Sequence, residues 1–284
     1  MIWRDWQKLI ADARLAHKRN PSAVTELALL NSIQDALNDN VGRKDGLIWQ
    51  RNPSLGTGPY NAMAQADMGF ELVTCGLLLN SMATLNDAFA VLDVITTAKG
   101  RGGLRWTRPD GWWFHSATEQ KYGLTLNQHL FACRDLARAA ELLAPGFGVQ
   151  AARYRAAAQK GIDQLAGTSF PNWGDYKPKI ATRTWAFYGH GGKDGKGYFL
   201  KAPGANPKKN GGYHTKVMEL VATLAGMGLM VPSNGLPWFY KMYQLKQSER
   251  LFVDSVPSSG GNFSALAGVD NVLSPFAVDF FEAL

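Results

Sequence analysis

Apolar residues recur every three to four positions through most of this chain, which is the period of an α-helix with one buried face. The pattern contains no strand alternation beyond short stretches such as 197–201. Helices that bury one stripe must pack against other helices, so the sequence predicts an all-α layered domain. We expect helices at 2–18, 22–38, 60–80, 83–98, 126–143, 147–166, 213–230, 237–250 and 263–283.

Three long segments rich in Gly and Pro interrupt these helices, at 40–59, 99–116 and 167–211. Loops of this length in a compact domain usually carry function. No fixed repeat period is found, which argues against a regular repeat solenoid. The helices pair head to tail, and this pairing is compatible with a bundle or with an α/α toroid of helical hairpins.

The positive charge of the chain is concentrated in the same loops. The formal net charge of the 284 residues is +7. Segments 172–216, 99–121 and 40–59 carry +7, +3 and +2, so the remainder carries −5. A basic surface favours polyanionic partners, which include nucleic acid, anionic membranes and acidic polysaccharides. We therefore expect the loops, rather than the helices, to bind an anionic partner.

Several classes of protein are excluded by the sequence. No apolar run reaches 18 residues, so no transmembrane helix is expected. The first residues carry charge every few positions and do not form a secretory signal. Cys75 and Cys133 lie in apolar helical patterns, which indicates two buried free thiols rather than a disulfide or a metal motif. We expect no bound metal and no cofactor.

Aromatic and basic residues alternate in the loops. Flat rings stack on sugar faces while Arg binds carboxylates through two hydrogen bonds, so the mixture favours an acidic saccharide as the partner. A groove for single-stranded nucleic acid and simple Arg-on-Trp stacking remain alternatives. The candidate substrate-binding residues are Arg105, Trp112, Trp113, Tyr122, Trp173, Lys177, His190, Lys193, Tyr213 and His214.

Two segments hold the best candidates for chemistry, 125–129 (Thr-Leu-Asn-Gln-His) and 183–190 (Arg-Thr-Trp-Ala-Phe-Tyr-Gly-His). His129 shares a helical stripe with Cys133 and Leu136, so one reading is a core histidine bonded to the backbone. Because His129 lies on the first turn of that helix, the other reading places it at the edge of a cleft.

An Asn and a His at the start of a helix, followed some fifty residues later by an Arg and a nearby Tyr, resemble the alginate lyase superfamily of α/α-toroid polysaccharide lyases. The resemblance covers about residues 60–190. It differs at one point, because Gln128 separates Asn127 from His129, which places these two side chains on different sides of the helix. Asn61, at the start of another helix, is an equally good match for the asparagine.

The resemblance implies that residues 1–284 form a single catalytic domain, an incomplete α/α toroid in which the long loops form a cleft. It also implies cleavage of a polyuronate by β-elimination without a metal. Neutralisation of the substrate carboxylate lets charge develop as the enolate forms, a role suited to Arg183 and to Asn61 or Asn127. Tyr188 or His129 would take the C5 proton.

Two other functions fit the composition. A glycoside hydrolase on the same scaffold would need two carboxylates, for which Asp67, Asp110 and Asp175 are candidates. A non-catalytic module that binds polyanions is the other alternative. For the lyase we expect an acidic polysaccharide as the partner, with no nucleic acid and no membrane. We also expect secretion or a periplasmic location, directed by a signal peptide outside this chain.

Overall fold

Helices predominate in the parts of the chain that the computed structural model describes, which confirms the helical class. These parts are residues 3–38, 41–50, 61–115, 124–176, 189–191, 198–199, 207–231, 236–248 and 273–284. The helices are α1 (Trp3–Arg19), α2 (Ala23–Asn38), α3 (Ala62–Leu78), α4 (Met82–Thr96), α5 (Leu126–Leu143), α6 (Gly148–Ala166), α7 (Pro207–Gly226), α8 (Leu236–Ser248) and α9 (Pro275–Glu282).

Most helix boundaries lie within two or three residues of the predicted ones. Helix α7 differs, because it begins at Pro207, earlier than the predicted start at 213. Helices α7 and α9 both begin at a proline, which suits the first helical position because its missing N–H would have no partner there. Residues 263–272 of the last predicted helix lie outside the described residues.

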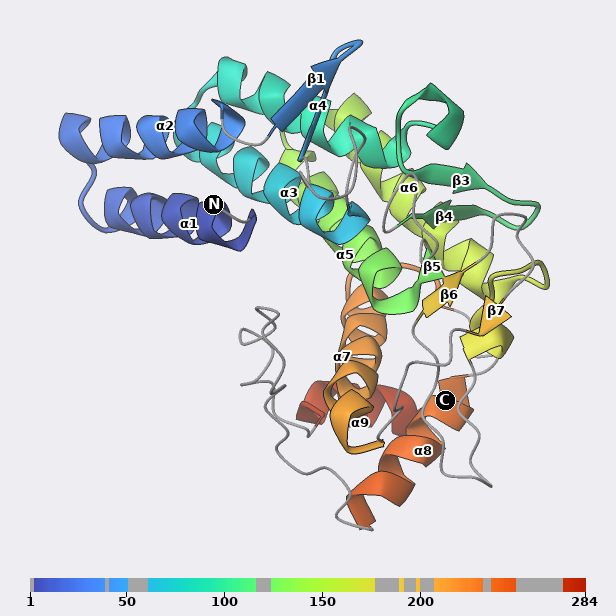
Figure 1. The fold of residues 1–284 in the computed structure, drawn as a ribbon. Coiled ribbons are helices and arrows are strands. Elements are labelled where there is room, and N and C mark those ends of the chain that lie inside the picture. Colours follow the sequence, from blue (N-terminus) through green and yellow to red (C-terminus); the bar gives the residue numbers. More distant parts are fainter. Residues whose placement is uncertain are drawn as a thin grey trace.

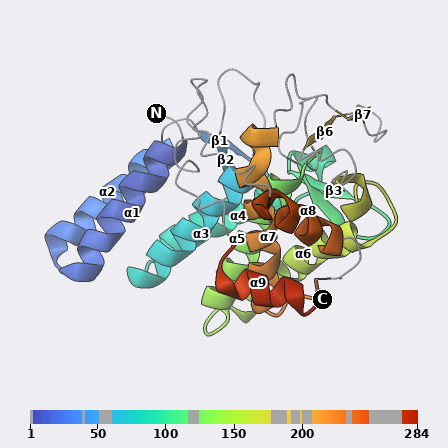
Figure 2. The ribbon, with the colours of Figure 1, turned by 90° about the horizontal axis from the view of Figure 1, so that it is seen from below.

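Successive helices form antiparallel hairpins, and the hairpins stand side by side (Figures 1 and 2). Helix α1 pairs with α2, α3 with α4, and α5 with α6. Helix α1 contacts α3, α3 contacts α5, and α5 contacts α7; we call these four helices the inner row. Helices α8 and α9 pack on α7. Two layers of helices therefore enclose most of the core.

Glycines allow the helices of two hairpins to approach closely. A Cβ atom at Gly69 of α3 would lie 2.5 Å from the Leu92 side chain of α4. A Cβ atom at Gly161 of α6 would lie 2.5 Å from Cys133 Sγ of α5. Both distances are far shorter than a normal contact, so each hairpin depends on a residue without a side chain at this point.

In the described residues, three small sheets accompany the helices, and of their strands only the last lies in a stretch where the sequence suggested one. They are an antiparallel hairpin of β1 (Val41–Lys44) and β2 (Leu47–Gln50), a second of β3 (Arg105–Thr107) and β4 (Trp112–Phe114), and a three-stranded sheet of β5 (Leu124–Thr125), β6 (Gly189–Gly191) and β7 (Tyr198–Phe199). Two 3₁₀ turns, Lys99–Arg101 and Trp173–Tyr176, complete the described elements.

Two further sequence predictions can be compared with the described residues. Cys75 and Cys133 are buried free thiols, as expected. Among the helices that the structure describes, none combines the length and the apolar character needed to cross a membrane.

Candidate functional site

The first turns of α3 and α5 lie next to the same strand, β4. The Ala62 N–H at the start of α3 donates to the carbonyl of His115, the residue that follows β4 (3.2 Å). The Phe114 N–H, at the end of β4, donates to Nδ1 of His129 in the first turn of α5 (3.1 Å). Two neighbouring inner-row helices thus begin at one place, which is where the sequence analysis puts its candidate asparagines.

The three-stranded sheet joins the two candidate segments at this same place. Leu124 and Thr125, which precede α5, pair with His190 and Gly189 of β6. The strand that follows the Arg183–Tyr188 segment is therefore bonded to the start of the helix that contains Asn127 and His129. Arg183 and Tyr188 themselves lie outside the described residues.

His129 is buried in the core with both ring nitrogens occupied. Nδ1 accepts the Phe114 N–H, so Nε2 carries the hydrogen and donates to the Gly161 carbonyl (3.0 Å). Trp113 stacks on the ring with centroids 4.0 Å apart. Burial lowers the pKa of His129 to about 3, although the hydrogen bond to Gly161 opposes the shift. A ring in this position has no lone pair for a substrate proton, so the prediction of His129 as the base does not hold here.

Asn61 is the N-cap of α3. Its side-chain oxygen accepts from the backbone N–H groups of Met63 (2.8 Å) and Ala64 (3.3 Å). An N-cap uses the carbonyl oxygen of the amide, whereas a substrate carboxylate would be bound by the NH₂ group. The capping role and the predicted carboxylate-binding role are therefore compatible in one side chain.

Among the residues that the structure describes, Asn127 and His115 are buried and have side-chain atoms without a hydrogen-bond partner. The Asn127 side-chain oxygen has no hydrogen bond, and neither do Nδ1 and Nε2 of His115. Burial lowers the pKa of His115 to about 3, with smaller contributions from the charges of Lys99 and His129. His115 is not among the candidate site residues named from the sequence. No periodicity marks it, since it follows a strand that was not predicted.

The β3–β4 hairpin carries Arg105, Trp106, Arg108 and Trp112. The Arg105 guanidinium lies 4.4 Å from the Trp112 ring centroid, and that of Arg108 lies 4.3 Å from the Trp106 centroid. Arg108 Nε also donates to the Phe170 carbonyl (2.9 Å). This is the Arg-on-Trp stacking that the sequence analysis kept as an alternative. The rings of Trp112 and Trp106 remain partly exposed, so a sugar could still reach them.

Two tryptophans predicted to line the site belong to the core instead. Trp113 is fully buried between the rings of His129 and Tyr176. Trp173 is 2% exposed and packs edge-on against Phe239. Rings without an accessible face cannot stack on a sugar, so neither is a substrate-binding residue in this structure.

The remaining predicted site residues are described only in part or not at all. His190 lies in β6, and Tyr213 and His214 lie in α7, but only their backbone is described. Tyr122, Lys177 and Lys193 lie outside the described residues.

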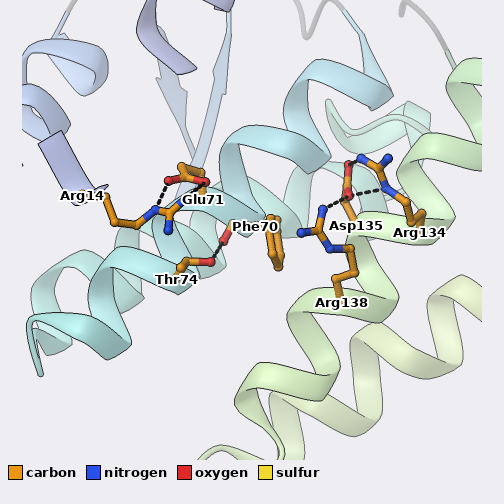
Figure 3. A network of polar contacts seen from close by, with 7 residues as sticks. All are labelled: Arg14, Phe70, Glu71, Thr74, Arg134, Asp135 and Arg138. Carbon is orange, nitrogen blue, oxygen red and sulfur yellow. Dashed lines mark hydrogen bonds and ion pairs between the residues drawn. The ribbon is translucent and has the colours of Figure 1, made fainter. Parts of the chain in front are cut away.

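The inner row carries a network of charged side chains that the sequence analysis missed (Figure 3). Glu71 of α3 forms an ion pair with Arg14 of α1. Asp135 of α5 has no exposed side-chain surface and accepts hydrogen bonds from Arg134 (2.8 and 3.0 Å) and Arg138 (3.4 Å). The Arg138 guanidinium also lies 3.8 Å from the centroid of Phe70. These contacts tie three neighbouring helices together.

Asp67 lies one turn before Glu71 on α3. Burial, with the charge of Asp135 as the next contribution, raises the pKa of its carboxyl to about 7. The other two aspartates proposed for a hydrolase hold loop backbone in place. Asp110 accepts from the Ser169 N–H (2.6 Å), and Asp175 accepts from the Asn172 N–H (2.7 Å). Within the described ranges, no three His, Cys, Asp or Glu side chains are placed to hold a metal ion.

Comparisons of this chain with protein-family models, with curated proteins and with solved structures gave no match. The likeness to the alginate lyase superfamily therefore rests on the residues quoted from the sequence alone.

Proposed function

We propose that this protein is a polysaccharide lyase that cleaves an acidic polyuronate by β-elimination, on an incomplete α/α toroid whose inner helices are the inner row. The pairing of β5 with β6 carries the proposal, because it joins the two segments of the candidate motif at the start of α5. The hairpins that stand side by side support the toroid.

The proposed site binds the uronate carboxylate through Arg183 and through the amide of Asn61 or Asn127. Neutralisation of that carboxylate acidifies the C5 proton, which Tyr188 removes as the phenolate. The electron pair forms the C4–C5 double bond while the bond from C4 to O4 breaks. The departing O4 takes the proton from Tyr188. An unperturbed Tyr has a pKa of about 10, so Tyr188 needs a nearby cation to lower its pKa, and we assign this role to Arg183.

The hydrolase alternative has less support. A two-carboxylate mechanism needs both groups at the substrate. Asp135, the carboxylate whose charge acts on Asp67, is fully buried and bonded to arginines, while Asp110 and Asp175 bond to loop backbone. A non-catalytic module that only binds polyanions differs from the lyase in one measurable way: it binds the polymer but releases no elimination product.

The test of the lyase is ultraviolet absorbance during incubation with poly-mannuronate and with glucuronan, because elimination creates a conjugated unsaturated uronate. We expect absorbance to rise with the wild-type protein and not with Tyr188→Phe, while Tyr188→Phe still binds the polymer. Folded wild-type protein that produces no absorbance change on any uronate polymer would refute the proposal.

Two substitutions of Asn61 separate its cap from its proposed catalytic role. Asn61→Asp keeps an oxygen for the cap but places a negative charge against the substrate carboxylate. We expect Asn61→Asp to fold with wild-type stability and to lose turnover, while Asn61→Ala loses about 1 kcal/mol of stability with the cap. Wild-type turnover by Asn61→Asp would assign the carboxylate to Asn127, for which Asn127→Asp is the corresponding variant.

A further inference from the structure

Two cations of the inner row lie against the same aromatic ring. The ring is that of Phe131 in α5, and the Arg134 guanidinium, one turn further along α5, lies 4.7 Å from its centroid. Lys216 comes from the neighbouring helix α7, and its Nζ lies 5.6 Å from the same centroid. Because like charges repel, two cations that two helices bring to one ring need an explanation beyond packing.

Lys216 lacks an anionic partner among the described residues, where every ion pair involves other cations. The two carboxylates whose charges act on it are bonded elsewhere. Asp135 accepts hydrogen bonds from two arginines. Glu219 accepts from the backbone N–H and from the hydroxyl of Ser274 (3.0 Å to the hydroxyl). The lysine is therefore a cation in search of a negative group.

The charges around Lys216 favour a bound anion. Burial lowers the pKa of the lysine, and the charge of Arg134 adds to the shift, while Glu219 and Asp135 oppose it without reversing it. The charged form is thus less favourable in the folded chain, and an anion beside it would stabilise that form. Asp67, whose carboxyl interacts with the charge of Arg134, has a pKa of about 7 and is only partly ionised near neutral pH.

Both cations can be reached from solvent. The Arg134 side chain is 19% exposed, and Lys216 is half-buried. Arg134 Nε and Nη2 donate to Asp135 (Figure 3), which leaves Nη1 without a partner among the described residues. Neither this Nη1 nor Lys216 Nζ is closed off from solvent as a buried, unbonded atom. Asp135 has no exposed side-chain surface, so the cations, and not this carboxylate, are presented to a ligand.

The two cations lie further along the helix face that begins at the proposed site. Asn127, Phe131 and Arg134 are spaced by four and then three residues, which places them in one stripe of α5. Arg134 lies about 10 Å further along the helix axis than Asn127. A polymer bound at the start of α5 therefore has a second cationic position further along the inner row.

We propose that Arg134 and Lys216 form a subsite between α5 and α7 that binds an oxyanion, the carboxylate of a further uronate unit of the polymer. The choice of a uronate as the source of the oxyanion rests on the proposed function, since free phosphate has the same chemistry. Lys216 supplies a point charge, and Arg134 supplies the N–H groups of Nη1.

The experiment compares Lys216→Met with wild-type protein in binding and in thermal unfolding. Met keeps an unbranched apolar stem and removes the charge. Calorimetry at constant ionic strength uses four probes: oligo-mannuronate, oligo-glucuronate, neutral manno-oligosaccharide and inorganic phosphate. We expect the dissociation constant of the best uronate probe to rise by about tenfold in Lys216→Met, with no difference for the neutral probe. The melting temperature without ligand should equal or exceed that of wild type, because the repulsion with Arg134 is removed.

Lys216→Arg and Lys160→Met are the matched controls. Lys216→Arg keeps the positive charge, so it should retain most of the affinity for the uronate probe. Lys160 is an exposed cation of α6, and Lys160→Met changes the net charge by the same amount outside the inner row. We expect Lys160→Met to bind every probe as wild type does.

The outcomes separate this proposal from the lyase proposal. Wild-type affinity for the uronate probe in Lys216→Met, a lower melting temperature of that variant without ligand, or no binding of any anionic probe by wild type overturns the subsite. Binding of phosphate alone that depends on Lys216 overturns the uronate as its occupant. Uronate binding that depends on Lys216 without any elimination product supports the subsite and overturns the lyase. Elimination accompanied by wild-type affinity in Lys216→Met does the reverse.

Discussion

Asp67→Asn tests whether the structure has identified a buried carboxyl that weakens the fold at neutral pH. The carboxyl lies on the inner row, where burial and the charge of Asp135 raise its pKa from 3.8 to about 7. Arg134 and Arg138 are close enough to lower the pKa, but their hydrogen bonds go to Asp135. Asn has nearly the same shape and carries no charge at any pH.

The size of the effect follows from the difference between the two states. The folded chain holds the Asp67 proton more tightly than the unfolded chain does, so unfolding free energy is lost as pH rises from about 4 to about 7. A shift of about three pKa units corresponds to about 4 kcal/mol. We therefore expect Asp67→Asn to match wild type near pH 4 and to exceed its stability by up to about 4 kcal/mol at pH 8.

The assay is urea unfolding of both proteins from about pH 4 to about pH 8, with the difference between them plotted against pH. His115 and His129 have lowered pKa values, so they lose stability in the opposite direction, as pH falls below about 6.5. Their contributions cancel in the difference. Asp12→Asn, which removes an exposed carboxylate of α1, controls for the loss of one negative charge.

The difference curve decides the matter. A rise between pH 4 and pH 7 followed by a plateau supports a buried carboxyl with a raised pKa. A flat curve, or an Asp67→Asn protein that is less stable than wild type at pH 8, refutes the reasoning about burial and about Asp135.

Two further predictions concern helix packing. Gly161→Ala places a methyl group against Cys133 Sγ and should lower the unfolding free energy by about 1–3 kcal/mol in urea, whereas Gly146→Ala, at a position with open space, should not. Arg14→Ala leaves Glu71 buried without its partner and should cost about 1–3 kcal/mol. Adding Glu71→Gln to Arg14→Ala should recover part of that loss; full additivity of the two substitutions would contradict a direct interaction.

The helices could be predicted from sequence because their boundaries are local. The segment 126–143 was placed at the correct residues, since its apolar stripe runs over five turns. The β1–β2 hairpin was missed although its signal is present. Asp45 and Gly46 adopt positive φ angles of 51° and 77° at the turn, and Asp-Gly at a two-residue turn is typical of such hairpins.

The site was predicted less well because its contacts join distant parts of the chain. His129 sits on an apolar stripe in sequence, but its partners are carbonyl and amide groups of Gly161 and Phe114, which no local pattern reveals. Asp67 and Asp135 look like ordinary exposed helix residues, but the packing of α3 on α5 leaves Asp67 only partly exposed and buries Asp135 fully. Whether a polar residue can bind a substrate depends on which of its atoms have no hydrogen-bond partner in the folded chain. That follows from the tertiary structure and cannot be read from the local sequence.

The pairing of β5 with β6 has a consequence for how the molecule reaches its folded state. It closes a loop of roughly sixty residues, which in a flexible chain costs on the order of 4 kcal/mol of entropy, with only two residue pairs to offset it. The α5–α6 hairpin removes most of that penalty, because it turns the chain back toward its own start. The short sheet therefore forms only after the hairpin. A substitution that disrupts the packing between α5 and α6 would then also weaken the pairing of β5 with β6 at the start of α5, although the substituted residue lies elsewhere.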